Sequence, residues 1–382
     1  MKYIDEYRDG GVAQTIAGAI TREARPDRIY RLMEFCGGHT HAISRYGLED
    51  LLPPSVRMIH GPGCPVCVLP MARIDLGISC ARDPRIALCV YGDLMRVPGS
   101  HGSSFLKAKA EGADVRMVYS TLDAIRIAEQ APDREVVFFA IGFETTTPPT
   151  ALAIRAARKK GLKNFSVICN HVLTPAAMTA IVESGGEEGV LVEGFVGPAH
   201  VSTVIGTRPY ETFARDYKKP VVIAGFEPLD VAQAILMLVR QINDGRAEVE
   251  NEYIRAVTRE GNQRAQAEVA EIFELRDAFE WRGLGWLPNS ALKLKEAYAE
   301  FDAERRFGLV AAPAADNPAC ECGAILRGVK KPRDCRLFGT VCTPDSPMGS
   351  CMVSSEGACA AHWTYGRFRE TAKAAAERRE VA

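Results

Sequence analysis

The sequence predicts an α/β protein in which two similar parallel-sheet domains face a cleft and a mainly helical domain follows. Short apolar runs alternate with amphipathic stretches up to about residue 229, and longer helical patterns without a convincing strand take over after it. A chain of 382 residues is also too long for one ordinary core. We expect the first α/β domain at 1–118, the second at 119–226 and the helical domain at 227–382.

Eight apolar runs have the length of strands, and their Val, Ile, Leu and Phe content indicates burial on both faces of a sheet. The expected strands are Ile29–Phe35, Val56–His60, Ile86–Tyr91, Val115–Tyr119, Val136–Ile141, Ser166–Cys169, Gly194–Val196 and Val221–Ala224. Two of them end in the similar turns Gly142–Thr145 and Gly225–Pro228, which hints at two related units facing each other.

Helices follow most of these strands, with Ser120 as one N-cap and prolines at several helix starts. The expected helix starts are near His39, Pro70, Leu122, Pro149, Pro175, Val201 and Leu229. The third region shows long helical patterns at Leu229–Ile242, Gln263–Phe279 and Ala291–Phe307, and a basic, alanine-rich tail, Arg367–Ala382, is expected to form a surface helix.

The charge balance and the N-terminus exclude several classes of protein. Lysine and arginine number 47 against 48 acidic residues, so nothing favours nucleic acid or an anionic membrane as a partner. The chain begins without a signal-peptide pattern and has no apolar run of about 18 residues, which predicts a cytoplasmic protein. Twelve cysteines in a reducing compartment indicate metal binding or redox chemistry rather than a disulfide framework.

Six of the cysteines lie within forty residues near the C-terminus, in a segment with too few apolar residues to fold alone. They are Cys320, Cys322, Cys335, Cys342, Cys351 and Cys359. A metal centre is the expected crosslinker, either a zinc ion or an iron-sulfur cluster. The long, irregular spacings lack the paired Cys-x2-Cys knuckles of zinc ribbons and favour a [4Fe-4S] cluster.

Cys36 lies where a strand is expected to end and a helix to begin, in the run Glu34-Phe35-Cys36-Gly37-Gly38-His39-Thr40-His41. A helix N-terminus stabilises an anion, so we expect a lowered pKa and a good thiolate ligand or nucleophile. His39 and His41 could tune this thiol, although either histidine alone is more often structural.

Cys64 and Cys67 form a Cys-x-x-Cys element between a strand and a helix, which is the placement of dithiol redox sites. The alternative is half of a zinc site, but no second Cys-x2-Cys lies nearby. We therefore expect a redox or ligand role. Three further cysteines, in expected helix or strand interiors, are assigned no chemistry; they are Cys80, Cys89 and Cys169.

Two other strand ends carry a side chain capable of proton transfer. Glu144, in Gly142-Phe143-Glu144-Thr145, is a candidate general acid or base, and the threonines after it can cap a helix. The loop is not a phosphate-binding loop, because the Gly-x4-Gly-Lys pattern is absent. His200, in Gly197-Pro198-Ala199-His200, lies at another strand end, where a functional and a structural role are equally plausible.

Five motifs, taken together and in this order, resemble the HypD family of [NiFe]-hydrogenase maturation factors. They are Cys-Gly-Gly-His-Thr-His at 36–41, Gly-Pro-Gly-Cys-Pro-Val-Cys at 61–67, Gly-Phe-Glu-Thr-Thr-Thr-Pro at 142–148, Gly-Pro-Ala-His-Val-Ser at 197–202 and Cys-Met-Val-Ser-Ser-Glu-Gly-Ala-Cys at 351–359. The likeness runs through almost the whole chain, and the spacing of four C-terminal cysteines matches the family's cluster motif. These four expected ligands are Cys320, Cys335, Cys342 and Cys359, while Cys322 and Cys351 remain candidates for substitute ligands or a redox pair.

The resemblance implies a role in building an iron centre with cyanide and carbon monoxide ligands, the Fe(CN)2CO moiety. It implies a complex with the small chaperone HypC, in which Cys36 binds the iron jointly with a chaperone cysteine. It also implies that HypE delivers cyanide as a thiocyanate, with HypF acting upstream of HypE. Cys64 and Cys67 would then supply electrons, with the [4Fe-4S] cluster recharging the pair.

Two rival interpretations come from other functional classes. A general thiol-disulfide oxidoreductase with a cluster would explain the dithiol and the C-terminal cysteines, but would leave Cys36, Glu144 and His200 without a task. A zinc-stabilised binding module without redox chemistry would explain the C-terminal segment alone. Visible absorption that bleaches on reduction separates iron-sulfur from zinc.

Overall fold

The computed structural model describes residues 5–184 and 191–367 and contains two parallel sheets. Sheet A has the order β2-β1-β7-β8-β9, with bounds Val56–His60, Tyr30–Glu34, Gly194–Gly197, Val221–Ile223 and Val249–Asn251. Sheet B has the order β4-β3-β5-β6, with bounds Val115–Val118, Ile86–Tyr91, Glu135–Gly142 and Phe165–His171. All strand pairs in both sheets are parallel, so the predicted fold class is confirmed.

Helices cover both sheets, as parallel strands joined by crossover connections require. Their bounds are Gly10–Glu23 (α1), Gly37–Tyr46 (α2), Pro65–Val68 (α3), Met71–Ala81 (α4), Phe105–Ala110 (α5), Thr121–Gln130 (α6), Thr147–Lys160 (α7), Thr174–Glu183 (α8), Ala199–Ile205 (α9), Glu211–Arg215 (α10), Pro228–Asn243 (α11), Gln263–Ile272 (α12), Ala303–Arg306 (α13), Cys322–Leu326 (α14) and Ala358–Ala361 (α15). The seven expected helix starts are each within two residues of an observed start, and Ser120 caps α6 by accepting a hydrogen bond from Leu122 N at 3.1 Å.

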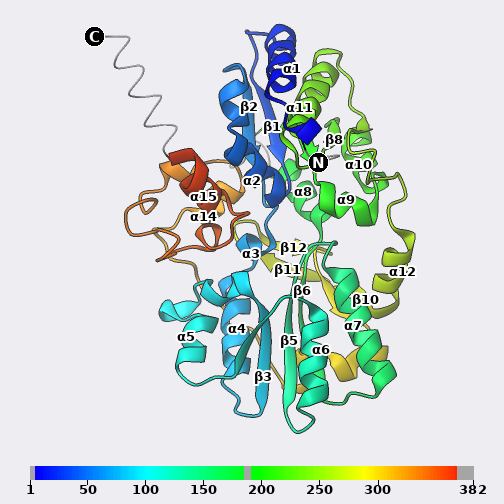
Figure 1. Ribbon diagram of the computed structural model, residues 1–382, viewed down its shortest axis with the longest axis vertical. Helices are drawn as coiled ribbons and strands as arrows, with labels where there is room; N and C mark the ends of the chain where they lie inside the picture. Colours follow the sequence, from blue (N-terminus) through cyan, green and yellow to red (C-terminus); the bar gives the residue numbers. More distant parts are fainter. Residues whose placement is uncertain (1–4, 185–190, 368–382) are drawn as a thin grey trace.

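The two sheets interleave along the chain. β3 and β4, expected in the first domain, hydrogen-bond with β5 in sheet B, while β7, expected in the second, pairs with β1 in sheet A. In Figure 1, sheet A and its helices α1, α2 and α11 occupy the upper half, and sheet B lies below. The cysteine-rich segment, drawn in orange and red, lies to one side between the halves (Figure 1).

The prediction that no strand follows Leu229 is wrong. Beyond β9, two antiparallel pairs occupy the third region: Phe273–Leu275 (β10) pairs with Leu292–Leu294 (β13), and Ala278–Trp281 (β11) pairs with Gly285–Pro288 (β12). The helix expected over Gln263–Phe279 therefore ends at Ile272, and within the described part of the chain only short helical turns follow β13. Gly283 and Asn289 adopt positive φ at the turns, which stops a continuing helix.

Apart from Arg367, the tail expected to form a surface helix lies outside the described residues. None of the helices in the described part of the chain has the length and apolar character that crossing a bilayer requires.

Candidate functional site

The carboxyl ends of both sheets meet around a cavity of about 480 Å³. Loops after β1, β2 and β7 of sheet A and after β3 and β5 of sheet B form its walls, and Cys36 and His200 both line it. In open α/β sheets, ligands bind beyond the carboxyl ends of the strands, and here two such edges share one cavity. The expected cleft is therefore present, with two of the predicted site residues in its wall.

Cys36 occupies the N-cap position of α2 and is only 7% exposed. Burial raises the pKa of its thiol, and the carboxyl groups of Glu356 and Glu34 raise it further, while the N–H groups of Gly38 and His39 act in the opposite sense. The expected lowering of this pKa is therefore wrong for the metal-free protein, because burial and two carboxyl groups outweigh the helix N-terminus. Binding of a metal ion to this thiol releases a proton.

Glu34, at the end of β1, organises the loop beneath Cys36 and is fully buried. Its carboxylate accepts hydrogen bonds from Cys36 N at 3.0 Å, from the Thr40 hydroxyl and from His60 Nδ1 at 2.9 Å. Burial lowers the pKa of His60, but the hydrogen bond and charge of Glu34 outweigh it and the net shift is upward. These contacts fix the Cys36 backbone at the floor of the cavity.

The Cys64 to Cys67 loop packs directly against Cys36. Gly37 N donates to Gly63 O at 3.0 Å, and a Cβ on Gly63 would lie 2.4 Å from Cys36 N, so only glycine permits this approach. Cys64 and Cys67 are joined as a disulfide, with Cα atoms 5.3 Å apart, and both are buried. The disulfide therefore lies directly beside the Cys36 loop.

His39 lies behind the cavity wall rather than in it. Its Nε2 lies 3.0 Å from Ala224 O and 2.9 Å from Gly225 O, and because both neighbours are carbonyl oxygens this nitrogen carries the proton. The rings of His39 and His200 both contact Phe226, with ring centroids 5.0 and 4.2 Å away. Burial lowers the pKa of both histidines.

Glu144 does not line the cavity but caps α8, the second helix after it. Its carboxylate accepts hydrogen bonds from Thr174 N at 2.9 Å and from the Thr174 hydroxyl at 3.0 Å, at the first residue of α8. Burial raises the pKa of Glu144 to about 7. Its neighbours Thr145 and Thr146 are the members of this motif that line the cavity.

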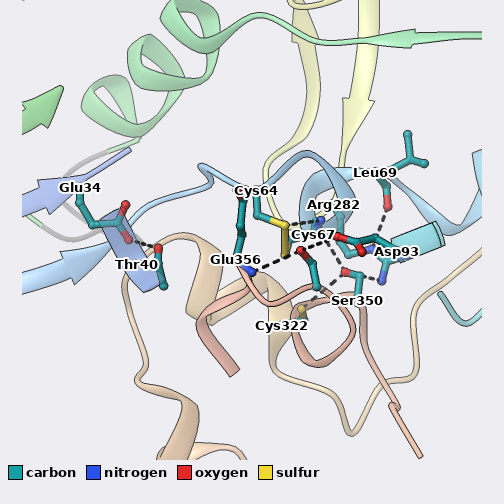
Figure 2. The surroundings of a disulfide bond; sticks show 11 residues. Glu34, Thr40, Cys64, Cys67, Leu69, Asp93, Arg282, Cys322, Ser350 and Glu356 are labelled. Atoms are coloured by element: carbon teal, nitrogen blue, oxygen red, sulfur yellow. Dashed lines mark hydrogen bonds between the residues drawn. A yellow bond between two sulfur atoms is a disulfide. The ribbon is translucent and has the colours of Figure 1, made fainter. Parts of the chain in front are cut away.

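Two carboxyl groups in the cavity wall were not among the predicted site residues. Asp93 follows β3 and Glu356 comes from the C-terminal segment (Figure 2). In that segment, Ser354 Oγ donates to Asp93 Oδ2 at 3.3 Å. Burial and the charges of Asp93 and Glu34 raise the pKa of Glu356. Asp93 could have been found from its place at a strand end, and Glu356 from its place inside the motif at 351–359.

The six C-terminal cysteines gather in one place, five buried and Cys320 half-buried. A hydrogen bond with Cys322 and burial raise the pKa of Cys320. Burial also raises the pKa of Cys359, with further contributions from Cys322, Cys342, Cys320 and Cys335. Such a set of clustered soft donors fits a thiolate-bound metal centre.

Among residues 5–184 and 191–367, no three His, Cys, Asp or Glu side chains already surround one point as a single metal ion requires. A [4Fe-4S] cluster binds each thiolate at a different iron, so its ligands need not converge on one point.

The cysteine-rich segment touches the disulfide through Ser350. Ser350 Oγ donates to Cys67 O at 3.0 Å and lies 3.9 Å from Cys322 Sγ (Figure 2). The remaining cysteines, Cys80, Cys89 and Cys169, are buried away from this region, and burial raises the pKa of each thiol to between about 11 and about 12.

Comparison with known proteins gives consistent results over nearly the whole chain. A family profile described as "HypD: Hydrogenase formation hypA family" matches residues 11–366. A "Hydrogenase maturation factor HypD" of Rhizobium leguminosarum bv. viciae is 71% identical over the full length of both chains. Proteins of the same name from Cupriavidus necator and Escherichia coli are 67% and 46% identical, covering 97% and 96% of this chain and 98% of each relative.

Proposed function

Because the chain belongs to the HypD family of hydrogenase maturation factors, we propose that it is the scaffold and redox component for assembling the Fe(CN)2CO moiety of [NiFe]-hydrogenase. It works in the cytoplasm with a HypC-type small chaperone and receives cyanide from HypE, which is charged by HypF. The observation that carries the proposal is the cavity between the two sheets, with Cys36 in its wall and the Cys64–Cys67 disulfide loop packed against it.

Cys36 is the protein's ligand to the iron that is being assembled. A thiolate is a soft ligand and suits low-spin iron that carries cyanide and carbon monoxide. The cavity of about 480 Å³ offers room for an iron with small diatomic ligands, and its opening leaves a side from which a chaperone cysteine can complete the site. Glu34 holds the Cys36 backbone in place, and Asp93, Glu356 and His200 can interact with ligands bound above the thiol.

Cys64 and Cys67 supply the two electrons that release cyanide from a carrier thiocyanate. Their two thiols give up two electrons and two protons and become a disulfide, while the S–CN bond of the carrier breaks. The products are a carrier thiol and hydrogen cyanide, whose anion binds the iron. Burial of both sulfurs beside Cys36 keeps this exchange close to the acceptor.

The C-terminal thiolates hold the centre that restores the dithiol. Cys320, Cys335, Cys342 and Cys359 are the proposed ligands, and a [4Fe-4S] cluster bound there would supply single electrons at low potential. The Ser350 contacts to Cys67 O and Cys322 Sγ place this segment against the pair that needs the electrons.

A second candidate is a thiol-disulfide oxidoreductase of broader role, which the disulfide and its contact with the cysteine-rich segment also support. It gives no task to Cys36 or to the acidic groups around the cavity. Reduction of unrelated protein disulfides at a rate comparable to the maturation reaction would favour it.

Infrared spectroscopy of the protein purified anaerobically with its small partner tests the proposal. We expect CN and CO stretches of an iron-bound species in the wild type and in Cys80→Ser, a buried thiol far from the cavity, and their loss in Cys36→Ala. Spectra without these stretches in the wild type, or an intact iron load in Cys36→Ala, would overturn it.

A further inference from the structure

A buried arginine lies between the disulfide loop and the cysteine-rich segment. Arg282 occupies the turn between β11 and β12, and its side chain is 2% exposed. Its backbone N donates to Val68 O at 2.7 Å, and its Nε donates to Leu69 O at 3.1 Å (Figure 2). Both carbonyls follow Cys67 directly in the chain, so Arg282 holds the end of the disulfide loop.

The same guanidinium reaches the other side of the junction. Its Nη1 donates to Ser350 Oγ at 3.0 Å, and Ser350 in turn donates to Cys67 O and contacts Cys322 Sγ (Figure 2). One arginine side chain therefore joins the loop of the disulfide to the segment that carries the six thiols. Its planar fork of donors suits such a bridge better than a lysine would.

The charge of Arg282 has little compensation from carboxylates. Nη2 makes no hydrogen bond among the described residues, and its one ion pair there is with Asp316 at 3.4 Å, whose own side chain is 41% exposed. A buried cation is costly unless a negative group faces it. The cysteine-rich segment can supply such groups, because a thiol that binds a metal is a thiolate, and Arg282 Nη1 donates to Ser350 of that segment at 3.0 Å.

We propose that Arg282 is the positioning residue for electron transfer between the C-terminal thiolate-bound centre and the Cys64–Cys67 pair. It holds the two together, and its fixed positive charge makes reduction of the centre easier. This inference rests on the proposed function, because it requires a redox-active centre on the C-terminal cysteines.

The electrons balance in two single transfers. A one-electron donor of the ferredoxin or flavodoxin class supplies each electron by way of the C-terminal centre. The disulfide takes up two electrons and two protons, the S–S bond breaks, and two thiols form. Each reduction adds negative charge beside Arg282, and a nearby cation stabilises the reduced state by Coulomb attraction.

The test compares three variants in full-length, iron-loaded protein prepared anaerobically. Arg282→Gln removes the charge, and Arg282→Lys keeps the charge but loses the fork. Arg327→Gln alters an arginine at the end of α14 that contacts the same turn, where its Nη1 donates to Gly283 O at 2.6 Å. Iron content is measured first, and the midpoint potential of the centre then follows from a redox titration monitored by visible absorption.

We expect Arg282→Gln to lower the equilibrium constant for one-electron reduction by at least tenfold, which corresponds to about 59 mV. Arg282→Lys and Arg327→Gln should stay within about threefold of the wild type. If Arg282→Gln loses its iron while Arg282→Lys keeps both iron and potential, the charge is again the cause and the proposal stands.

An unchanged potential in iron-loaded Arg282→Gln would overturn the role of Arg282, and so would an equal effect in Arg327→Gln or loss of iron in all three variants. Failure of the proposed function looks different, because the wild type itself would then show no reducible centre.

Discussion

Replacing Glu144 by glutamine should make the protein more stable at alkaline pH and leave its stability at acid pH almost unchanged. Burial raises the pKa of this carboxyl group from 4.5 to about 7. A pKa difference of one between the folded and unfolded states corresponds to about 1.4 kcal/mol, so the ionised group destabilises the folded state by about 3 kcal/mol. The pKa of Glu144 is higher in the folded state than in the unfolded state. The stability that depends on a protonated Glu144 is therefore fully present below pH 4.5 and is lost as the pH rises through about 7.

Urea unfolding at several pH values between about 4.5 and about 8.5, followed by the fluorescence of the tryptophans, measures this difference. Buried Trp281 reports on the region, because its ring centroid lies 6.0 Å from that of Phe143. The exposed Glu248→Gln is a matched control and should run parallel to the wild type at every pH. Parallel curves for Glu144→Gln and the wild type would refute the reasoning.

Three further outcomes are expected. Glu304→Gln removes the carboxylate that lies 2.7 Å from the guanidinium groups of Arg73 and Arg276, and should cost about 3 to 5 kcal/mol of unfolding free energy. A cost below about 1 kcal/mol would contradict a tightly coupled ionic network at this site. Gly63→Ala puts a methyl group 2.4 Å from Cys36 N, and the displaced loop should speed alkylation of the Cys36 thiol several-fold, whereas an unchanged rate would mean that the loop absorbs the methyl group. Cys359→Ser should lose iron and visible absorption while Cys80→Ser keeps both, and equal iron in the two variants would argue against Cys359 as a ligand.

Every strand of the two sheets except β9 could be predicted from the sequence, because buried parallel strands are nearly continuous apolar runs. β9, with three half-buried residues, lacks that signal. The hairpins of the third region were missed because Gln263–Phe279 also has helical periodicity, and tertiary pairing of Phe273–Leu275 with Leu292–Leu294 decided between the two structures. The run Trp281-Arg282-Gly283-Leu284-Gly285, an aromatic strand end followed by a glycine turn, was the available sign of a hairpin.

Much of the candidate site followed from one rule, that functional groups collect at the carboxyl ends of parallel strands. The rule placed Cys36 and His200 in the cavity wall correctly. The rule did not place Glu144 correctly, because the free N–H groups at the start of α8 attract its carboxylate. Glu144 and Thr174 are thirty positions apart, so the local sequence gives no sign of this contact. Arg282 had no local signal, since its importance comes from a hairpin packed between two distant cysteine motifs.

The interleaving of the two sheets sets an order for synthesis. Sheet B can be completed once residue 171 has left the ribosome, whereas β1 and β2 gain their next neighbour only with β7, which begins at Gly194. Domains generally fold as units while the chain emerges, so the lower half of the molecule is built first and becomes a platform for the upper half. The loop that carries Cys36 is therefore finished late, after the surface that will enclose it already exists, and its thiol stays open in the nascent chain until β7 has been made.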